Sequence, residues 1–216
     1  MTKSFILLLS ILLASVACAQ EISNDADPKT VNINNKISPG FYASLGLGRG
    51  YTNFSSSNFF NTDMSHDPRY VLAGRFALGY DIDEYFGVEL AYTQFSPEKF
   101  ANLNNTGWDG DVREQSYDFQ TVIRLPLFAD IYGVAKLGPA YQHVEQRLIS
   151  NGPAGLQPPY TNNVDIWRPR FAVGLQTALA EYSGLALNFE YSLLPHDDEH
   201  NVPDTELYTI GVILHF

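Results

Sequence analysis

From residue 40 onward, apolar and polar side chains alternate along the chain with a period of two. This alternation is typical of β-strands, in which successive side chains point to opposite faces. In the segment 70–81, for example, Leu72 shares one face with Phe76, and Arg75 lies on the other. The same pattern recurs eight times and predicts strands at 40–51, 70–81, 85–95, 113–125, 131–147, 167–179, 183–194 and 205–216.

The connections between these strands alternate between long and short. An even number of strands with this alternation is typical of an up-and-down membrane barrel, with long outer loops and short periplasmic turns. We therefore predict an all-β chain, whose residues 40–216 form an eight-stranded antiparallel up-and-down transmembrane β-barrel in the bacterial outer membrane. The long connections are 52–69, 96–112, 148–166 and 195–204, and the short ones lie near 81–84, 126–130 and 180–182.

The apolar face of such a barrel must point toward lipid. Backbone polar groups have no water partners in hydrocarbon, so only helices and closed barrels can span a membrane. Aromatic residues also recur at both ends of the apolar face, as they do in the girdles of membrane barrels. A soluble β-sandwich or lipocalin, the alternative, gives no reason for aromatics at both rims. The aromatic residues of the predicted girdles are Tyr70, Tyr92, Tyr117, Tyr141, Trp167, Tyr191 and Tyr208 at the long-loop end and Phe41, Tyr80, Phe86 and Phe216 at the other end.

The opposite face carries charges, which must point into the lumen. A charge that faces lipid at mid-depth costs about 2–4 kcal/mol. Eight strands leave an interior only wide enough for side chains to fill, so we expect these charges to form a plug of ion pairs. A catalytic carboxylate site and a gated pore are the alternatives. The predicted lumenal charge network consists of Arg75, Glu89, Asp118, Arg124, Lys136, Arg170 and Glu190.

Two prolines interrupt the strand pattern. Pro139 and Pro169 lie within predicted strands, and a proline cannot donate a hydrogen bond to its neighbour. A closed barrel offers no edge strand to hold them. We therefore expect β-bulges near the rim at both positions.

The first 39 residues predict two short segments before the barrel. Residues 1–19 contain Lys3, an apolar run and the sequence Ala17-Cys18-Ala19, the form of a cleavable signal peptide. In the alternative, Cys18 is a lipidated N-terminus, but the usual leucine three residues upstream is missing. Residues 20–39 are polar without an apolar period, so we expect a flexible N-terminal leader.

Composition and motifs exclude several classes of function. The net charge is −11 at pH 7, and an acidic chain without a basic patch is a poor nucleic-acid binder. The run His196-Asp197-Asp198-Glu199-His200 could hold a metal, but consecutive residues in a loop favour a solvated acidic segment. The sequence contains no G-x-S-x-G motif and no serine suitably placed beside a histidine. We therefore predict no catalytic residues, no bound metal and no cofactor.

Three segments resemble the small eight-stranded outer-membrane barrels, namely the OmpA-type transmembrane domains and the opacity-type surface proteins. They are 40–48, 132–138 and the C-terminal segment 208–216. The resemblance implies contact with outer-membrane lipid and lipopolysaccharide. It also implies that the barrel-assembly machinery recognises the last strand, in which Tyr208 and Phe216 form the assembly signal.

The same resemblance implies a structural barrel that displays long surface loops for adhesion or surface interaction, with a host or surface molecule as ligand. A passive small-solute channel of the porin type is the first alternative. An outer-membrane lipid-modifying enzyme is the second.

Deletion of Phe216 tests the assembly signal. The deletion removes one outward aromatic side chain, whose burial is worth about 2 kcal/mol, too little to unfold a closed barrel. The truncated protein should therefore assemble poorly in cells and still refold in detergent micelles, as measured by the gel shift between boiled and unboiled samples. Normal assembly in cells without Phe216 would contradict the recognition role.

Overall fold

The computed structural model describes residues 39–52, 70–100, 108–128, 131–150, 160–178, 184–200 and 202–216. The predicted signal peptide with Cys18 and nearly all of the predicted leader lie outside these residues, so both stay predictions. No helix in the described part of the chain is long and apolar enough to cross a membrane.

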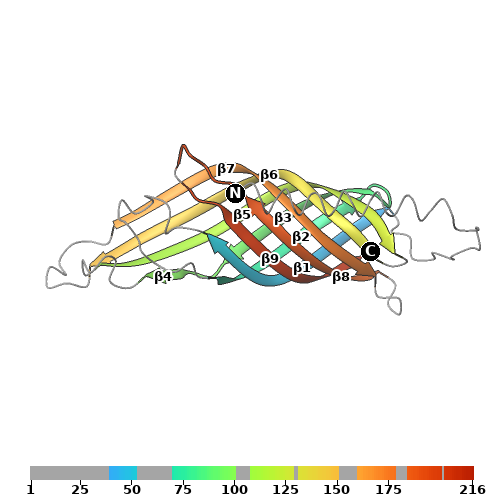
Figure 1. Ribbon diagram of the computed structural model, residues 1–216, viewed down its shortest axis with the longest axis horizontal. Coiled ribbons are helices and arrows are strands. Elements are labelled where there is room, and N and C mark those ends of the chain that lie inside the picture. The colour runs from blue at the N-terminus through green and yellow to red at the C-terminus, as the bar shows by residue number, and fades with distance from the viewer. Residues whose placement is uncertain are drawn as a thin grey trace, which may run out of the picture.

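The described residues form antiparallel strands that follow one another around a closed sheet (Figure 1). The strands are β1 (Gly40–Thr52), β2 (Val71–Asp81), β3 (Phe86–Phe95), β4 (Glu98–Phe100), β5 (Trp108–Phe128), β6 (Ile131–Ser150), β7 (Tyr160–Ala178), β8 (Leu185–Leu194) and β9 (Thr205–His215). Their order is β3-β2-β1-β9-β8-β7-β6-β5-β4, and an additional pairing of β3 with β5 closes the sheet. The short strand β4 follows β3 after Ser96 and Pro97 and pairs with β5 alone. The eight long strands therefore form the predicted up-and-down barrel, which is confirmed.

The first and last long strands close the barrel. β1 pairs with β9 from Tyr42 opposite His215 to Thr52 opposite Thr205. The amide of Phe216 also donates to the carbonyl of Phe41, at 2.9 Å. This seam leaves no open sheet edge in the closed part of the barrel, as hydrocarbon requires.

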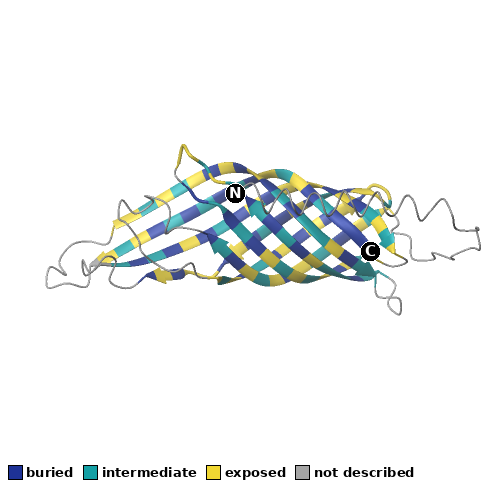
Figure 2. Ribbon diagram, viewed as in Figure 1, coloured by how far each residue is buried: buried dark blue, intermediate teal, exposed yellow. Residues whose placement is uncertain are grey.

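The two faces of each strand differ as the alternation predicts. Along β2, Leu72, Phe76 and Leu78 are exposed on the outside, and Arg75 and Asp81 are buried inside. Exposed and buried positions alternate along every long strand, as the chequered pattern of Figure 2 shows. The apolar face is therefore the outer surface, which contacts lipid in a membrane.

Aromatic side chains on the outer surface pair across neighbouring strands. Tyr92 lies against Tyr117 with ring centroids 5.0 Å apart, and Tyr141 lies against Trp167 at 5.4 Å. Tyr191 of β8 and Tyr208 of β9 pair in the same way, with ring centroids 4.8 Å apart. At the other end, Phe41 and Tyr80 pair at 4.9 Å. We call Tyr92, Tyr117, Tyr141, Trp167, Tyr191 and Tyr208 the aromatic belt. The belt marks the level at which the long-loop end of the barrel leaves the lipid.

Three strands continue far beyond the aromatic belt. The prediction that 96–112 and 148–166 are loops is wrong in part, because β4 and the ends of β5, β6 and β7 lie there. Asp, Asn and Gly in these segments hide the alternation in the sequence. We call β4 with residues 108–116, 142–150 and 160–168 the protruding sheet; it extends to the left in Figure 1.

The protruding sheet has an apolar core of its own. Its inner face and the β8–β9 connection contribute side chains that are all nearly inaccessible to solvent, and Leu148 and Val164 pack against them. The connection adds a β-bridge between Asp197 and Val202, so it covers this face instead of trailing into solvent. The core residues are Phe100, Val112, Val144, Ile166 and Val202.

The predicted bulges at Pro139 and Pro169 are wrong. The two prolines lie directly opposite each other in β6 and β7. Neither can donate, so they form a pair without mutual hydrogen bonds, and each nitrogen points to the strand on its other side. On those sides the ladders are interrupted: β5 and β6 have no pairs between Asp118–Ala140 and Thr121–Leu137, and the β7–β8 ladder begins at Phe171. The register shift in the β5–β6 ladder lies instead between Pro126 and Phe128.

Gly138, next to the first proline, allows β5 and β6 to approach closely. A Cβ atom added there would overlap the carbonyl oxygen of Phe119, whereas one added at Gly74 would lie 4.0 Å from the nearest atom, in Leu47. We expect Gly138→Ala to lower the free energy of unfolding by about 1–3 kcal/mol, because the backbone must shift.

Gly74→Ala is the matched control, and it should leave stability unchanged or slightly raised, since alanine restricts the unfolded chain. Urea titration in detergent micelles measures both variants. Equal stability of the two would contradict the close approach.

Candidate functional site

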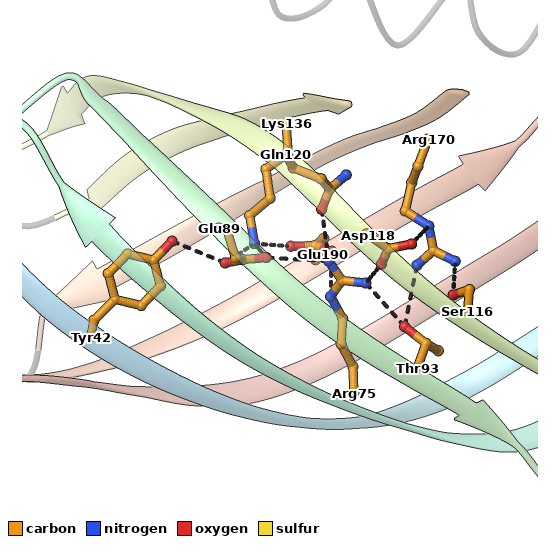
Figure 3. Close-up of polar contacts among 10 residues, drawn as sticks. All are labelled: Tyr42, Arg75, Glu89, Thr93, Ser116, Asp118, Gln120, Lys136, Arg170 and Glu190. Atoms are coloured by element: carbon orange, nitrogen blue, oxygen red, sulfur yellow. Dashed lines mark hydrogen bonds and ion pairs between the residues drawn. The ribbon is translucent and has the colours of Figure 1, made fainter. Parts of the chain in front are cut away.

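Six of the seven predicted lumenal charges meet in the middle of the barrel (Figure 3). Each comes from a different strand. They meet in the lumen because each occupies an inward position of the alternating pattern. We call this group the central cluster. Its members are Arg75 of β2, Glu89 of β3, Asp118 of β5, Lys136 of β6, Arg170 of β7 and Glu190 of β8.

Arg75 contacts three of the other strands from the centre of the cluster. Its Nη1 donates to Asp118 Oδ2 at 2.6 Å, and its Nη2 donates to Glu89 Oε1 at 3.2 Å. The same guanidinium donates to Gln120 Oε1 at 2.7 Å, and its Nε lies 3.7 Å from Glu190 Oε1. One buried cation thereby ties β2 to β3, β5 and β8.

The other two cations complete the pairing. Lys136 Nζ lies 2.9 Å from both carboxylate oxygens of Glu89 and 2.8 Å from Glu190 Oε2. Arg170 Nε lies 3.3 Å from Asp118 Oδ1, and its Nη2 donates to Ser116 Oγ at 2.9 Å.

The central cluster is electrically neutral. Three cations face three carboxylates, and none of these side chains is more than slightly accessible to solvent. Removing charges from water is expensive unless each charge finds a partner and further hydrogen bonds. The arrangement fits a structural plug, in which no charge is left over to bind an ion in transit.

Arg124 lies outside the central cluster, in a second group near the short turns. Its Nη1 is 2.6 Å from Asp81 Oδ1, and His215 Nε2 is 3.2 Å from Asp81 Oδ2. Tyr42 joins the two groups, since Arg124 lies over its ring and its hydroxyl donates to Glu89 Oε2 at 3.0 Å. The second group therefore ties the last strand to β2 and β5.

A third polar group closes the lumen near the aromatic belt, and it was not predicted. Arg168 donates to Gln142, whose amide donates to Glu114. Thr52 Oγ1 also donates to Glu114, at 2.7 Å. The Arg168 guanidinium further donates to the carbonyls of Pro195 and Pro203, at 2.9 Å each, and so holds the β8–β9 connection in place. All of these side chains lie on inward positions, so the alternation contained the signal that could have found them.

The central cluster borders a small cavity of about 10 Å³ in the described part of the chain, lined by residues that include Ser44, Lys136, Asn188 and Glu190. This volume holds about one water molecule. Together, the three polar groups and this cavity describe a filled lumen.

Of the predicted assembly residues, Tyr208 lies on the outer face of β9 near its start, and Phe216 directly follows the end of β9. Tyr208 belongs to the aromatic belt, and its hydroxyl donates to Glu206 Oε2 at 3.2 Å. Phe216 is largely exposed at the short-turn end. Both side chains are accessible from the lipid side, and their role in assembly stays a prediction.

Histidine and aspartate side chains of the segment 196–200 pair with one another. His196 Nε2 lies 3.0 Å from Asp198 Oδ1, and His200 Nδ1 lies 3.1 Å from Asp197 Oδ1. Burial alone would raise the pKa of Asp197, but hydrogen bonds from the His200 backbone and ring hold it below its ordinary value. Over the described residues, no group of three or more His, Cys, Asp or Glu side chains could hold a metal ion.

Replacement of Arg75 tests the plug. Arg75→Met leaves the carboxylates of Asp118 and Glu89 short of a partner, which should lower the free energy of unfolding by about 3–5 kcal/mol. Arg113→Met is the control: Arg113 is half exposed and pairs with Asp111 and Glu145 at the surface, where an ion pair is worth about 1 kcal/mol or less. Denaturant titration in micelles compares them, and equal losses would contradict a buried, paired interior.

Conductance tests whether the lumen is filled. Planar lipid bilayers that contain the purified barrel should carry little or no steady current, because the buried, paired side chains of the central cluster fill the middle of the lumen. A steady ohmic current through the intact protein would contradict the plug and favour the channel alternative.

Comparisons with known proteins agree with this architecture. The family model for the outer membrane protein beta-barrel domain matches residues 6–216. A comparison with curated proteins finds no significant match. Among solved structures, Ail, the attachment invasion locus protein of Yersinia pestis, is 14% identical, with a TM-score of 0.57 over 83% of this chain and 100% of that chain. Ail also matches as its complex with the heparin analogue sucrose octasulfate, at a TM-score of 0.54.

Two further solved barrels are similar to the same extent. OprG from Pseudomonas aeruginosa is 14% identical, with a TM-score of 0.57 over 84% of this chain and 98% of that chain. Neisserial surface protein A is 13% identical, with a TM-score of 0.56 over 82% and 97%. At these identities the structures support the fold, and the family model covers nearly the whole chain. The chain therefore belongs to the outer membrane protein β-barrel family and is a bacterial outer-membrane protein.

Proposed function

We propose that this protein is a structural outer-membrane barrel that presents its protruding sheet outside the cell for adhesion or surface interaction. The protruding sheet is the observation that carries the proposal. It continues past the aromatic belt and has a buried apolar core of its own. A loop that only joins two strands needs neither feature.

The reach of the sheet supports a role at the surface. On β5, Tyr117 in the aromatic belt is nine residue steps from Trp108 at the strand end, counted from 108 to 117. At about 3.3 Å per residue and a tilt of roughly 45°, they extend about 20 Å along the membrane normal. Recognition is commonly placed on such projections from a rigid scaffold.

The similar structures support the same class of function without fixing the ligand. Ail is named for attachment and invasion, and one of its structures contains a sulfated heparin analogue. This chain carries a net charge of −11, so a polyanion is not the ligand that we propose. We also propose contact of the aromatic belt with outer-membrane lipid and lipopolysaccharide, and recognition of the last strand by the barrel-assembly machinery.

The two alternatives have less support. The filled lumen disfavours a small-solute channel. For a lipid-modifying enzyme, the outward pair of His143 and Asp165, 2.6 Å apart, is the best candidate base. Its nearest outward neighbours in the ladders are Gln115, Tyr141 and Glu145, none of which is a serine nucleophile.

Shortening the β6–β7 hairpin tests the proposal. Val144 and Val164 lie opposite each other, so residues 145–163 can be replaced by an Asn-Gly turn that suits a two-residue hairpin. We expect bacteria that express this variant to lose binding to cultured host cells relative to bacteria that express the intact protein. The gel shift between boiled and unboiled samples, which reports a closed barrel, should persist. Unchanged binding with an intact barrel would contradict the proposal.

A further inference from the structure

In the described part of the chain, one side of β7 has no strand partner along its outer half. The β6–β7 ladder reaches Leu148 opposite Tyr160, but the β7–β8 ladder begins only at Phe171 opposite Leu193. Among the described residues, no backbone hydrogen bond from another segment reaches positions 160–169 on that side. We call this side the free edge of β7; β7 forms the upper margin of the protruding sheet in Figure 1.

The paired prolines determine which groups point to the free edge. Since Pro139 and Pro169 face each other without hydrogen bonds, the even-numbered residues of this part of β7 bond to β6. The odd-numbered residues therefore direct their backbone N–H and C=O groups away from β6. The residues whose backbone N–H groups point to the free edge are Thr161, Asn163, Asp165 and Trp167.

The free edge lacks the features that usually block strand addition. Natural proteins protect edges with lysine, proline, bulges or very short strands. Here Pro169 stands only at the inner end, and the segment 160–167 reads YTNNVDIW, which contains one charge. Its ladder with β6 runs without a register shift. A donor and an acceptor at every second residue match another extended strand and no compact ligand.

The surroundings of the free edge are acidic. Arg168 holds the carbonyls of Pro195 and Pro203, so the β8–β9 connection lies beside the outer half of β7. That connection carries Asp198, whose side chain is 98% exposed, and Glu199. An incoming strand with lysine or arginine would gain from these charges, and one with carboxylates would be repelled.

We propose that the free edge of β7 captures an extended segment of a partner protein by strand addition, and that this segment carries lysine or arginine. The proposal rests on the proposed function, since it needs the protruding sheet to be displayed. A second copy in the same membrane fits poorly: two barrels related by an axis along the membrane normal would present β7 strands that cross, because barrel strands tilt by about 35–45°.

Amide hydrogen exchange tests the edge in the intact protein. In micelles, the amides of Thr161, Asn163, Asp165 and Trp167 should exchange fast, while those of Asn162, Val164 and Ile166 exchange slowly. Adding a ten-residue peptide of alternating threonine and lysine should slow the first set. Slow exchange of both sets without peptide would mean that the chain covers its own edge, and would overturn the proposal.

Two variants at one position separate the backbone donor from the side chain. Asn163→Pro removes a free-edge donor and spares the ladder with β6, so it should weaken peptide binding about tenfold or more. Asn163→Ala keeps the donor and should bind as the unmodified protein does. Fluorescence anisotropy with a labelled peptide measures both, and the gel shift confirms that both variants fold. Equal binding by the two variants would overturn strand addition.

The charge requirement has its own control. A peptide of alternating threonine and glutamate should bind at least about tenfold more weakly than the lysine peptide. Equal affinity would overturn the basic partner. The host-cell assay separates the two proposals. If the variant with the shortened hairpin loses binding to host cells but Asn163→Pro keeps it, strand addition at the free edge is contradicted and the proposed function stands. If the variant with the shortened hairpin still binds host cells, the proposed function is contradicted, and the peptide assay on the intact protein still tests strand addition at the free edge.

Discussion

The whole molecule follows from the requirement that every backbone polar group in hydrocarbon finds a partner within the protein. Pairing of β1 with β9 meets this requirement by closing the sheet. Closure fixes which side chains face lipid and which face the lumen, because side chains alternate along a strand. With eight strands the lumen is narrow, so the inward side chains must fill it. Polar inward residues can do so only as mutually paired groups.

The lumen satisfies this second requirement in layers. Arg124 and Asp81 pair near the short turns, Arg75 gathers the central cluster, and Arg168 with Glu114 closes the end near the aromatic belt. Each layer links strands that are distant in sequence, so the barrel is a rigid support. Arg168 also reaches the carbonyls of the β8–β9 connection and thereby joins the interior to the protruding sheet. The end of the barrel that carries this sheet is the end to which we assign recognition.

The alternation in the sequence predicted the eight long strands and six of the residues that meet in the central cluster. It failed where local chemistry disguised the pattern. Asp81 lies where the predicted strand 70–81 meets the predicted turn 81–84, and Arg168 and Glu114 lie on inward positions, but none of the three is among the predicted lumenal charges. The sequence predicts loops for the outer parts of the protruding sheet, at 98–100, 108–112, 148–150 and 160–166, because Asn, Asp and Gly interrupt the alternation there. The fit of Pro139 against Pro169 depends on the register between β6 and β7, which no single strand reveals.

In the function that we propose, the interior supports the barrel and the protruding sheet recognises a surface molecule. A chimera tests it most directly: residues 98–114, 142–168 and 195–204 are grafted onto the barrel of OprG at equivalent strand positions. Binding of the chimera to host cells is then compared with binding of unmodified OprG in the same non-adherent strain. The graft should confer the binding of the intact protein although none of the central cluster is transferred. A chimera that folds and reaches the surface but binds no better than unmodified OprG would contradict it.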